Sequence, residues 1–75
     1  NTGCTLVDCN RITIGNNVLI GPNVQIYTAT HPVELEKRLT PVETPDGIKY
    51  IRHTYALSVT IEDGCWIGGG VIILP

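Results

Sequence analysis

His31 is the side chain whose type and position best suit chemistry. It closes a run of regularly spaced aliphatic residues and is followed at once by Pro32, so a strand is expected to give way to a loop there. An imidazole can accept a proton at neutral pH and return it. His31 could therefore act as a general base toward a hydroxyl that attacks an acyl group. The alternative is a ring that merely ends the strand and faces solvent.

The elements that must position His31 are six-residue repeats. Each begins with an aliphatic residue, continues with a small or turn-forming residue, and carries a small or branched residue at position five; they are Ile14–Leu19, Ile20–Gln25, Ile26–His31, Ile61–Trp66 and Ile67–Ile72. This spacing is typical of a hexapeptide parallel β-helix. We expect an all-β, left-handed parallel β-helix in which three hexads form one coil of 18 residues.

The first three hexads predict specific positions within that coil. The position-one residues Ile14, Ile20 and Ile26 should lie on three different faces, and the position-five residues Val18, Val24 and Thr30 should point inward. An antiparallel hairpin or sandwich is the alternative, because short stretches of the chain also alternate between apolar and polar residues. Such folds do not require a constant six-residue spacing, so the parallel coil is favoured.

The hexad phase breaks between Ile26 and Ile61. The residues at about 32–57 contain three prolines, several charges and the turn pair Asp46-Gly47, which predicts a long inserted loop that runs over the surface. We expect residues 1–75 to form one partial β-helix domain. Because the chain opens on Asn1 and closes within a hexad, we also expect it to be a segment of a longer protein.

Composition narrows the classes of function. Five Lys and Arg against seven Asp and Glu give a net charge of −2, so no basic stripe for nucleic acid is expected. No apolar stretch approaches the roughly 20 residues that span a bilayer. Three cysteines cannot all pair within one chain, and we expect reduced thiols, no metal site and a cytoplasmic location. Cys65, at position five of its hexad, is expected to be a small inward-facing residue.

Two stretches carry a family resemblance. Residues 10–32, which end in Thr28-Ala29-Thr30-His31-Pro32, and residues 65–75, which contain Trp66-Ile67-Gly68-Gly69, are similar to the maltose, galactoside and nodulation-type O-acetyltransferases of the hexapeptide-repeat superfamily. This resemblance implies a homotrimer that moves the acetyl group of acetyl-coenzyme A to a hydroxyl of a sugar-like acceptor. It also implies that His31 is the general base.

The resemblance extends to four further residues. It implies that Asn1 and Asp8 bind the acceptor, whereas a frayed terminus and a turn cap are the structural alternatives. It implies that Trp66 and Gly69 contact the coenzyme, and the alternative for Trp66 is apolar packing. Cys9 stands where some relatives have a second acidic residue, so acceptor recognition is expected to differ.

Other functions are less consistent with the sequence. A zinc hydratase on the same coil needs three protein ligands, and only His31 and His53 are available, with His53 expected to be solvated in the charged loop. A stacking or trimerisation segment without chemistry is a further possibility. In serine acetyltransferases, a closer alternative, the coil resumes directly after the His-Pro pair, whereas here a long loop intervenes.

Overall fold

A computed structural model describes all residues, 1–75, as short strands with one short helix. The elements in chain order are β1 (Thr5–Val7), β2 (Ile12–Ile14), β3 (Leu19–Ile20), β4 (Gln25–Tyr27), β5 (Ala29–Thr30), α1 (Leu35–Arg38), β6 (Leu39–Thr44), β7 (Gly47–Arg52), β8 (Tyr55–Ala56), β9 (Val59–Ile61), β10 (Trp66–Ile67) and β11 (Ile72–Ile73). The expected all-β class is confirmed. No helix is long and apolar enough to cross a membrane.

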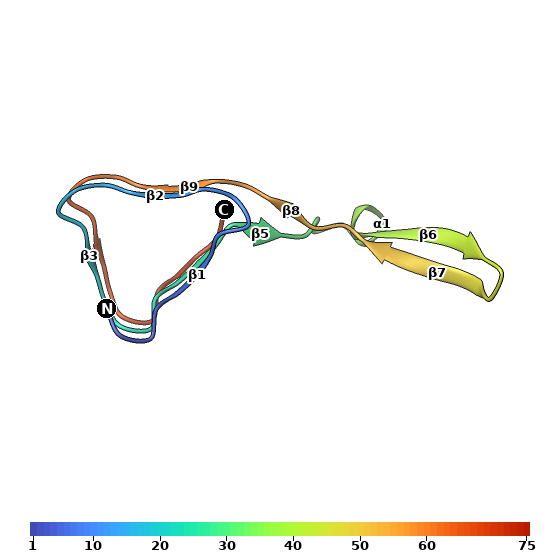
Figure 1. The fold of residues 1–75 in the computed structure, drawn as a ribbon, viewed down its shortest axis with the longest axis horizontal. Coiled ribbons are helices and arrows are strands. Elements are labelled where there is room, and N and C mark those ends of the chain that lie inside the picture. Colours follow the sequence, from blue (N-terminus) through green and yellow to red (C-terminus); the bar gives the residue numbers. More distant parts are fainter.

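The chain winds into a triangular coil with three sides (Figure 1). Side A consists of β1, β4 and β11, side B of β2 and β9, and side C of β3 and β10. All pairings within these sides are parallel, and each joins strands from successive coils. The antiparallel hairpin or sandwich alternative is therefore wrong for the repeat region.

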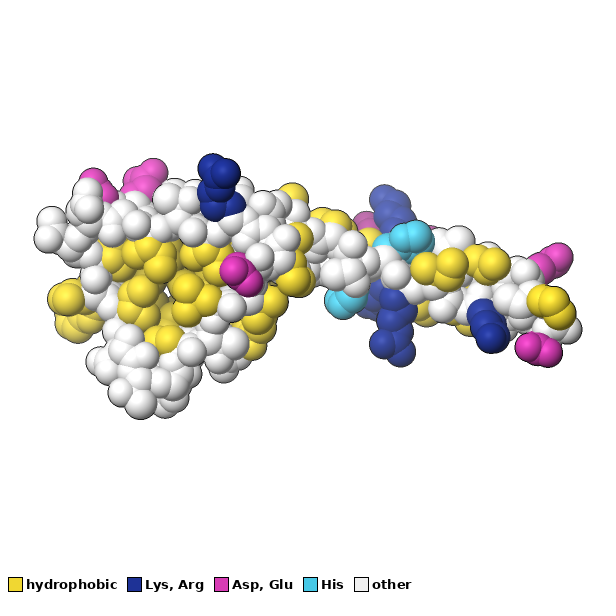
Figure 2. All heavy atoms as spheres, viewed as in Figure 1, with side chains coloured by type: hydrophobic (Ala, Val, Ile, Leu, Met, Phe, Trp, Pro, Cys, Tyr) yellow, Lys and Arg dark blue, Asp and Glu magenta, His cyan; other side chains and the backbone are white.

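Hexad spacing determines which residues stack. The position-one residues Ile14, Ile20 and Ile26 lie on sides B, C and A, as predicted, and pair with Ile61, Ile67 and Ile73 of the next coil. Because each side repeats its aliphatic residue, the coil interior is apolar, and hydrophobic side chains fill the open end of the triangle in Figure 2. The buried core comprises Val24, Ile26, Val59 and Ile61.

The corners explain the turn residues of the repeat. Asn17 and Asn23 adopt φ of 57°, and Gly64 and Gly70, one coil later, adopt φ of 75° and 74°. Asn and Gly are the residues that tolerate this left-handed conformation. Position two needs glycine for a different reason, since a Cβ at Gly21 would lie 2.5 Å from the backbone nitrogen of Gly69.

The first coil is longer than an 18-residue turn. Leu6 pairs with Ile26, which lies 20 positions later, because residues 8–11 lengthen the corner between sides A and B. At the same corner one coil later the chain leaves the triangle entirely. Thr28 is fully buried there, whereas Thr30 lies in β5 and pairs with Tyr55. The inward position predicted for Thr30 is thus occupied by Thr28.

The inserted residues form an ordered arm and not a loop lying over the coil surface. β5 pairs antiparallel with β8, and β6 pairs antiparallel with β7 around Pro45 and Asp46. The arm projects away from the triangle (Figure 1), which gives the molecule extents of 55 × 20 × 18 Å. A two-residue turn, Pro45-Asp46, joins β6 and β7, which pair from Thr44 with Gly47 out to Leu39 with Arg52. Large apolar side chains of the arm, including Ile48 and Tyr50, remain exposed.

Candidate functional site

The corner between sides A and B holds the base of the arm through buried Thr28. Its hydroxyl donates to the carbonyl oxygen of Val7 at 2.6 Å and accepts from the backbone nitrogen of Asn10 at 3.0 Å. The Asn10 side-chain amide donates to the carbonyl oxygen of Ala56 in β8 at 2.9 Å. These contacts attach the returning strand of the arm to the first coil, so the point where the arm emerges is well defined.

His31 lies immediately beyond this corner, where the β5–β8 ladder ends. Thr30 and Tyr55 form the last pair of the ladder, so His31 faces Thr54 across the two strands. Pro32 has no N–H group and cannot continue a ladder. The chain then makes the α1 turn, and the backbone nitrogen of His53 donates to the Arg38 carbonyl at 2.8 Å, which closes the loop.

The His31 ring is oriented by the opposite strand. Its Nδ1 lies 2.9 Å from the carbonyl oxygen of His53 and 3.3 Å from the hydroxyl of Thr54. A carbonyl can only accept, so Nδ1 must be the donor in this contact. In the neutral ring only one nitrogen carries hydrogen, which leaves Nε2 with a free lone pair. His31 is exposed, and Nε2 is therefore suited to accept a proton from a bound molecule.

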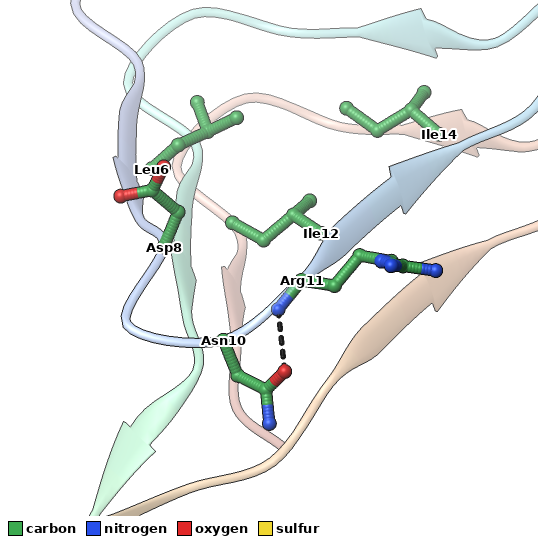
Figure 3. A pocket seen from close by; sticks show the side chains of 6 residues that line it. All are labelled: Leu6, Asp8, Asn10, Arg11, Ile12 and Ile14. Atoms are coloured by element: carbon green, nitrogen blue, oxygen red, sulfur yellow. Dashed lines mark hydrogen bonds between the residues drawn. The ribbon is translucent and has the colours of Figure 1, made fainter.

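Asp8 lies at the same corner, beside the open end of the first coil. A hollow of about 560 Å³ there is lined by Leu6, Asp8, Asn10, Arg11, Ile12 and Ile14. In Figure 3 the Arg11 side chain extends away from Asp8, and the carboxylate is not engaged by its neighbours. An exposed carboxylate can accept hydrogen bonds from hydroxyl groups. Asp8 thus lies at the corner from which the arm departs, and His31 lies beyond that corner at the end of the β5–β8 ladder; His31 does not line the hollow.

The other predicted site residues lie elsewhere on the same chain. Trp66 is on side C, pairs with Leu19, and is 82% exposed. Gly69 follows it at the corner between sides C and A, where a Cβ would lie 3.3 Å from the Pro22 ring. Asn1 lies near that same corner in the first coil, where Gly3 lies against Asn23. The side-chain oxygen of Asn1 accepts from the Thr2 backbone nitrogen at 2.7 Å. A single chain does not bring these residues to His31.

The cysteines and the remaining polar residues add no metal site. All three cysteines are free, and no group of three or more His, Cys, Asp and Glu residues lies together. Cys65 is exposed because it lies in the last coil, where no further strand pairs with β9 or β10. Its inward-facing position stays a prediction.

Three residues around His31 were not predicted. His53 is exposed, as expected; in addition its carbonyl contacts His31, and its ring nitrogen Nε2 contacts the hydroxyl of Thr40. Thr54 provides a second acceptor. A backbone carbonyl has no signature in residue type, so no pattern in the sequence could have revealed this contact.

Comparison with known proteins identifies the family. The profile described as "Hexapeptide repeat of succinyl-transferase" matches residues 11–38 and 54–75. The chain belongs to the hexapeptide-repeat family, and the unmatched residues 39–53 coincide with the outer part of the arm.

Several of the relatives are named as acetyltransferases. The whole chain is 46% identical to galactoside O-acetyltransferase of Lactococcus lactis over 31% of that protein. It is 45% identical to a provisionally named acetyltransferase of Schizosaccharomyces pombe over 31% of that protein, and 39% identical to nodulation protein L of Rhizobium meliloti over 35%. The chain spans about a third of the length of these relatives. No solved structure matches it significantly.

Proposed function

We propose that this protein is an O-acetyltransferase that moves the acetyl group of acetyl-coenzyme A to a hydroxyl of a sugar-like acceptor. The relatives that are named as acetyltransferases support the reaction class. The observation that carries the assignment is the His31 ring, whose Nδ1 is engaged by the His53 carbonyl at 2.9 Å while Nε2 remains free on an exposed side chain.

The proposed reaction is a direct transfer. Nε2 of His31 removes the proton from the acceptor hydroxyl as that oxygen attacks the thioester carbon. The new C–O bond forms, the C–S bond breaks, and the leaving coenzyme A thiolate takes the proton from the imidazolium. Backbone N–H groups beside the thioester stabilise the negative charge of the intermediate oxygen. The Asp8 carboxylate accepts from other acceptor hydroxyls and so orients the reacting one.

The site is completed by a second copy of the chain. Asp8 lies at the corner between sides A and B and His31 at the base of the arm that leaves that corner, whereas Trp66 lies on side C and Gly69 at the corner between sides C and A. We propose a homotrimer in which side C of one chain faces the arm base of the next. Trp66 is 82% exposed and its cross-strand neighbour Leu19 is 66% exposed, which is a high exposure for paired apolar side chains and suits a covered interface.

The same proposal covers the handedness of the coil and the role of the arm. The coil is left-handed, as hexapeptide repeats imply, and residues 1–75 form a partial β-helix domain of a longer protein. Residues 32–57 are an insertion whose inner end, at the base of the arm, orients His31. We also propose a cytoplasmic location, which the three free cysteines support because reducing compartments keep thiols unpaired.

The test uses the full-length protein and its His31→Ala variant with acetyl-coenzyme A and a panel of sugars. We expect acetylated sugar and free coenzyme A from the wild type, and a kcat lower by about 10²- to 10⁴-fold in the variant. The KM for acetyl-coenzyme A should change little because His31 does not hold the donor. Near-normal turnover by His31→Ala would reject the assignment.

A further inference from the structure

We propose that Thr40 and His53, together with Thr54, are positioning residues that select the tautomer of His31. This inference rests on the proposed role of His31 as the base. Thr40 lies in β6 and His53 just beyond β7, so the outer hairpin of the arm, and not the coil, would determine which nitrogen of His31 is free.

The contacts form a short relay. The Thr40 hydroxyl contacts Nε2 of the His53 ring, and the His53 carbonyl accepts from Nδ1 of His31 at 2.9 Å. The His53 backbone nitrogen also donates to the Arg38 carbonyl at 2.8 Å. His53 is thus fixed at its ring and at its backbone nitrogen. These two attachments determine the direction of its carbonyl.

That direction matters because His31 is exposed. In water a neutral imidazole favours the tautomer that carries hydrogen on Nε2, which would leave no lone pair there to accept a proton. The His53 carbonyl and the Thr54 hydroxyl, 2.9 Å and 3.3 Å from Nδ1, are two acceptors that favour hydrogen on Nδ1 instead. A His53 carbonyl that turned away would leave Nδ1 to water and reduce the fraction of base in its active form.

The location of the relay gives it a further consequence. His31 and His53 lie at the break between the two antiparallel ladders of the arm, where eight residues, 31–38, separate β5 from β6. The strands form no ladder hydrogen bond at this break, so strand pairing does not hold the His31 ring in place. The Thr40–His53 contact joins a side chain of the hairpin to the residue whose carbonyl contacts His31, so a change at Thr40 is transmitted to His31 through it.

The experiment compares Thr40→Val and Thr54→Val with the wild type in the full-length protein. Nitrogen NMR of ¹⁵N-histidine-labelled protein, with His31→Ala used to assign the signals, reports which ring nitrogen carries hydrogen. We expect both variants to shift His31 toward hydrogen on Nε2. Since a neutral hydrogen bond contributes modestly, kcat should fall about 2- to 10-fold with little change in either KM. Thr40→Ser should restore both readouts.

Thr44→Val is the matched control. Thr44 lies on the same strand and the same face as Thr40, and its hydroxyl donates to the Gly47 carbonyl at 2.6 Å near the hairpin turn, far along β6 from His53. We expect it to leave kcat and the His31 signals unchanged. Wild-type signals and kcat in both Thr40→Val and Thr54→Val, or an equal loss in Thr44→Val, would overturn the inference. If His31→Ala keeps normal turnover, the proposed function fails, and the NMR signals alone then decide the tautomer assignment.

Discussion

At the scale of single residues, the coil depends on glycines, which have no Cβ atom. Gly21 has no Cβ, and the space that a Cβ would occupy lies 2.5 Å from the Gly69 nitrogen and 2.8 Å from its Cα. Backbone atoms cannot move aside as a flexible side chain can. The glycine at position two is therefore a packing requirement between coils, which the sequence pattern indicates without giving the reason.

Replacing Gly21 with alanine should destabilise the protein. Because the added methyl group meets backbone, we expect a loss of about 1–3 kcal/mol in the free energy of unfolding. Urea unfolding at a fixed protein concentration measures it. Gly68→Ala is the control, since a Cβ there meets nothing within 4 Å. Equal urea midpoints for Gly21→Ala and Gly68→Ala would show that packing between coils does not require glycine at position 21.

The hydroxyl of Thr28 is expected to contribute more to stability than the shape of its side chain. Thr28→Val keeps the volume but removes the hydroxyl that accepts from the Asn10 nitrogen at 3.0 Å and donates to the Val7 carbonyl at 2.6 Å; that carbonyl keeps its bond from the Thr28 backbone nitrogen at 3.1 Å. We expect a cost of about 1–3 kcal/mol because both groups lie at a partly buried corner. Thermal unfolding would measure it against Thr13→Val, whose side chain is exposed. A negligible cost at Thr28 would contradict its role in holding the arm base.

At the scale of elements, the corner turns repeat from coil to coil. Asn17 and Gly64 occupy equivalent corners and both have positive φ, at 57° and 75°. Asn17→Gly should therefore be tolerated, whereas Asn17→Ala should lose about 1–2 kcal/mol because its Cβ disfavours this conformation. The difference between the two midpoints of chemical unfolding is the measurement. Alanine as stable as glycine would mean that the corner can relax to negative φ.

The sequence predicted the elements where local pattern and packing agree. Ile14, Ile20 and Ile26 could be assigned to three sides because a six-residue period allows few other arrangements. The pattern failed at Thr30, since the chain leaves the coil after Thr28, and at the arm, whose strands depend on pairing between residues 39–44 and 47–52. The spacing of apolar residues along one strand does not show which other strand it pairs with. His31 could be identified by position, but the His53 carbonyl that orients it is a product of that pairing.

At the scale of the whole molecule, the small core is the dominant feature. Only five residues are buried, and four of them are aliphatic. A chain of this length buries only about 60% of its extended surface on folding. The isolated 75 residues should therefore lack a cooperative thermal transition and turn over poorly. Circular dichroism melting and an acetyl-transfer assay test this. A sharp melt together with normal turnover would contradict it.

The separation of the site residues is the second feature at this scale. His31 is at the arm base, and Trp66 is on side C of the same chain. In a cyclic assembly each interface then uses His31 from one chain and Trp66 from its neighbour. Two chains with different defects can therefore form an intact site between them, which no single-chain site allows.

Mixing two inactive variants tests this claim most directly. Full-length His31→Ala and Trp66→Ala chains are unfolded, refolded together in equal amounts and assayed for acetyl transfer. We expect the mixture to regain about a quarter of the wild-type rate, because one interface in four combines the intact residue of each variant. Activity no higher than that of either variant refolded alone would contradict a site shared between chains with His31 as its base.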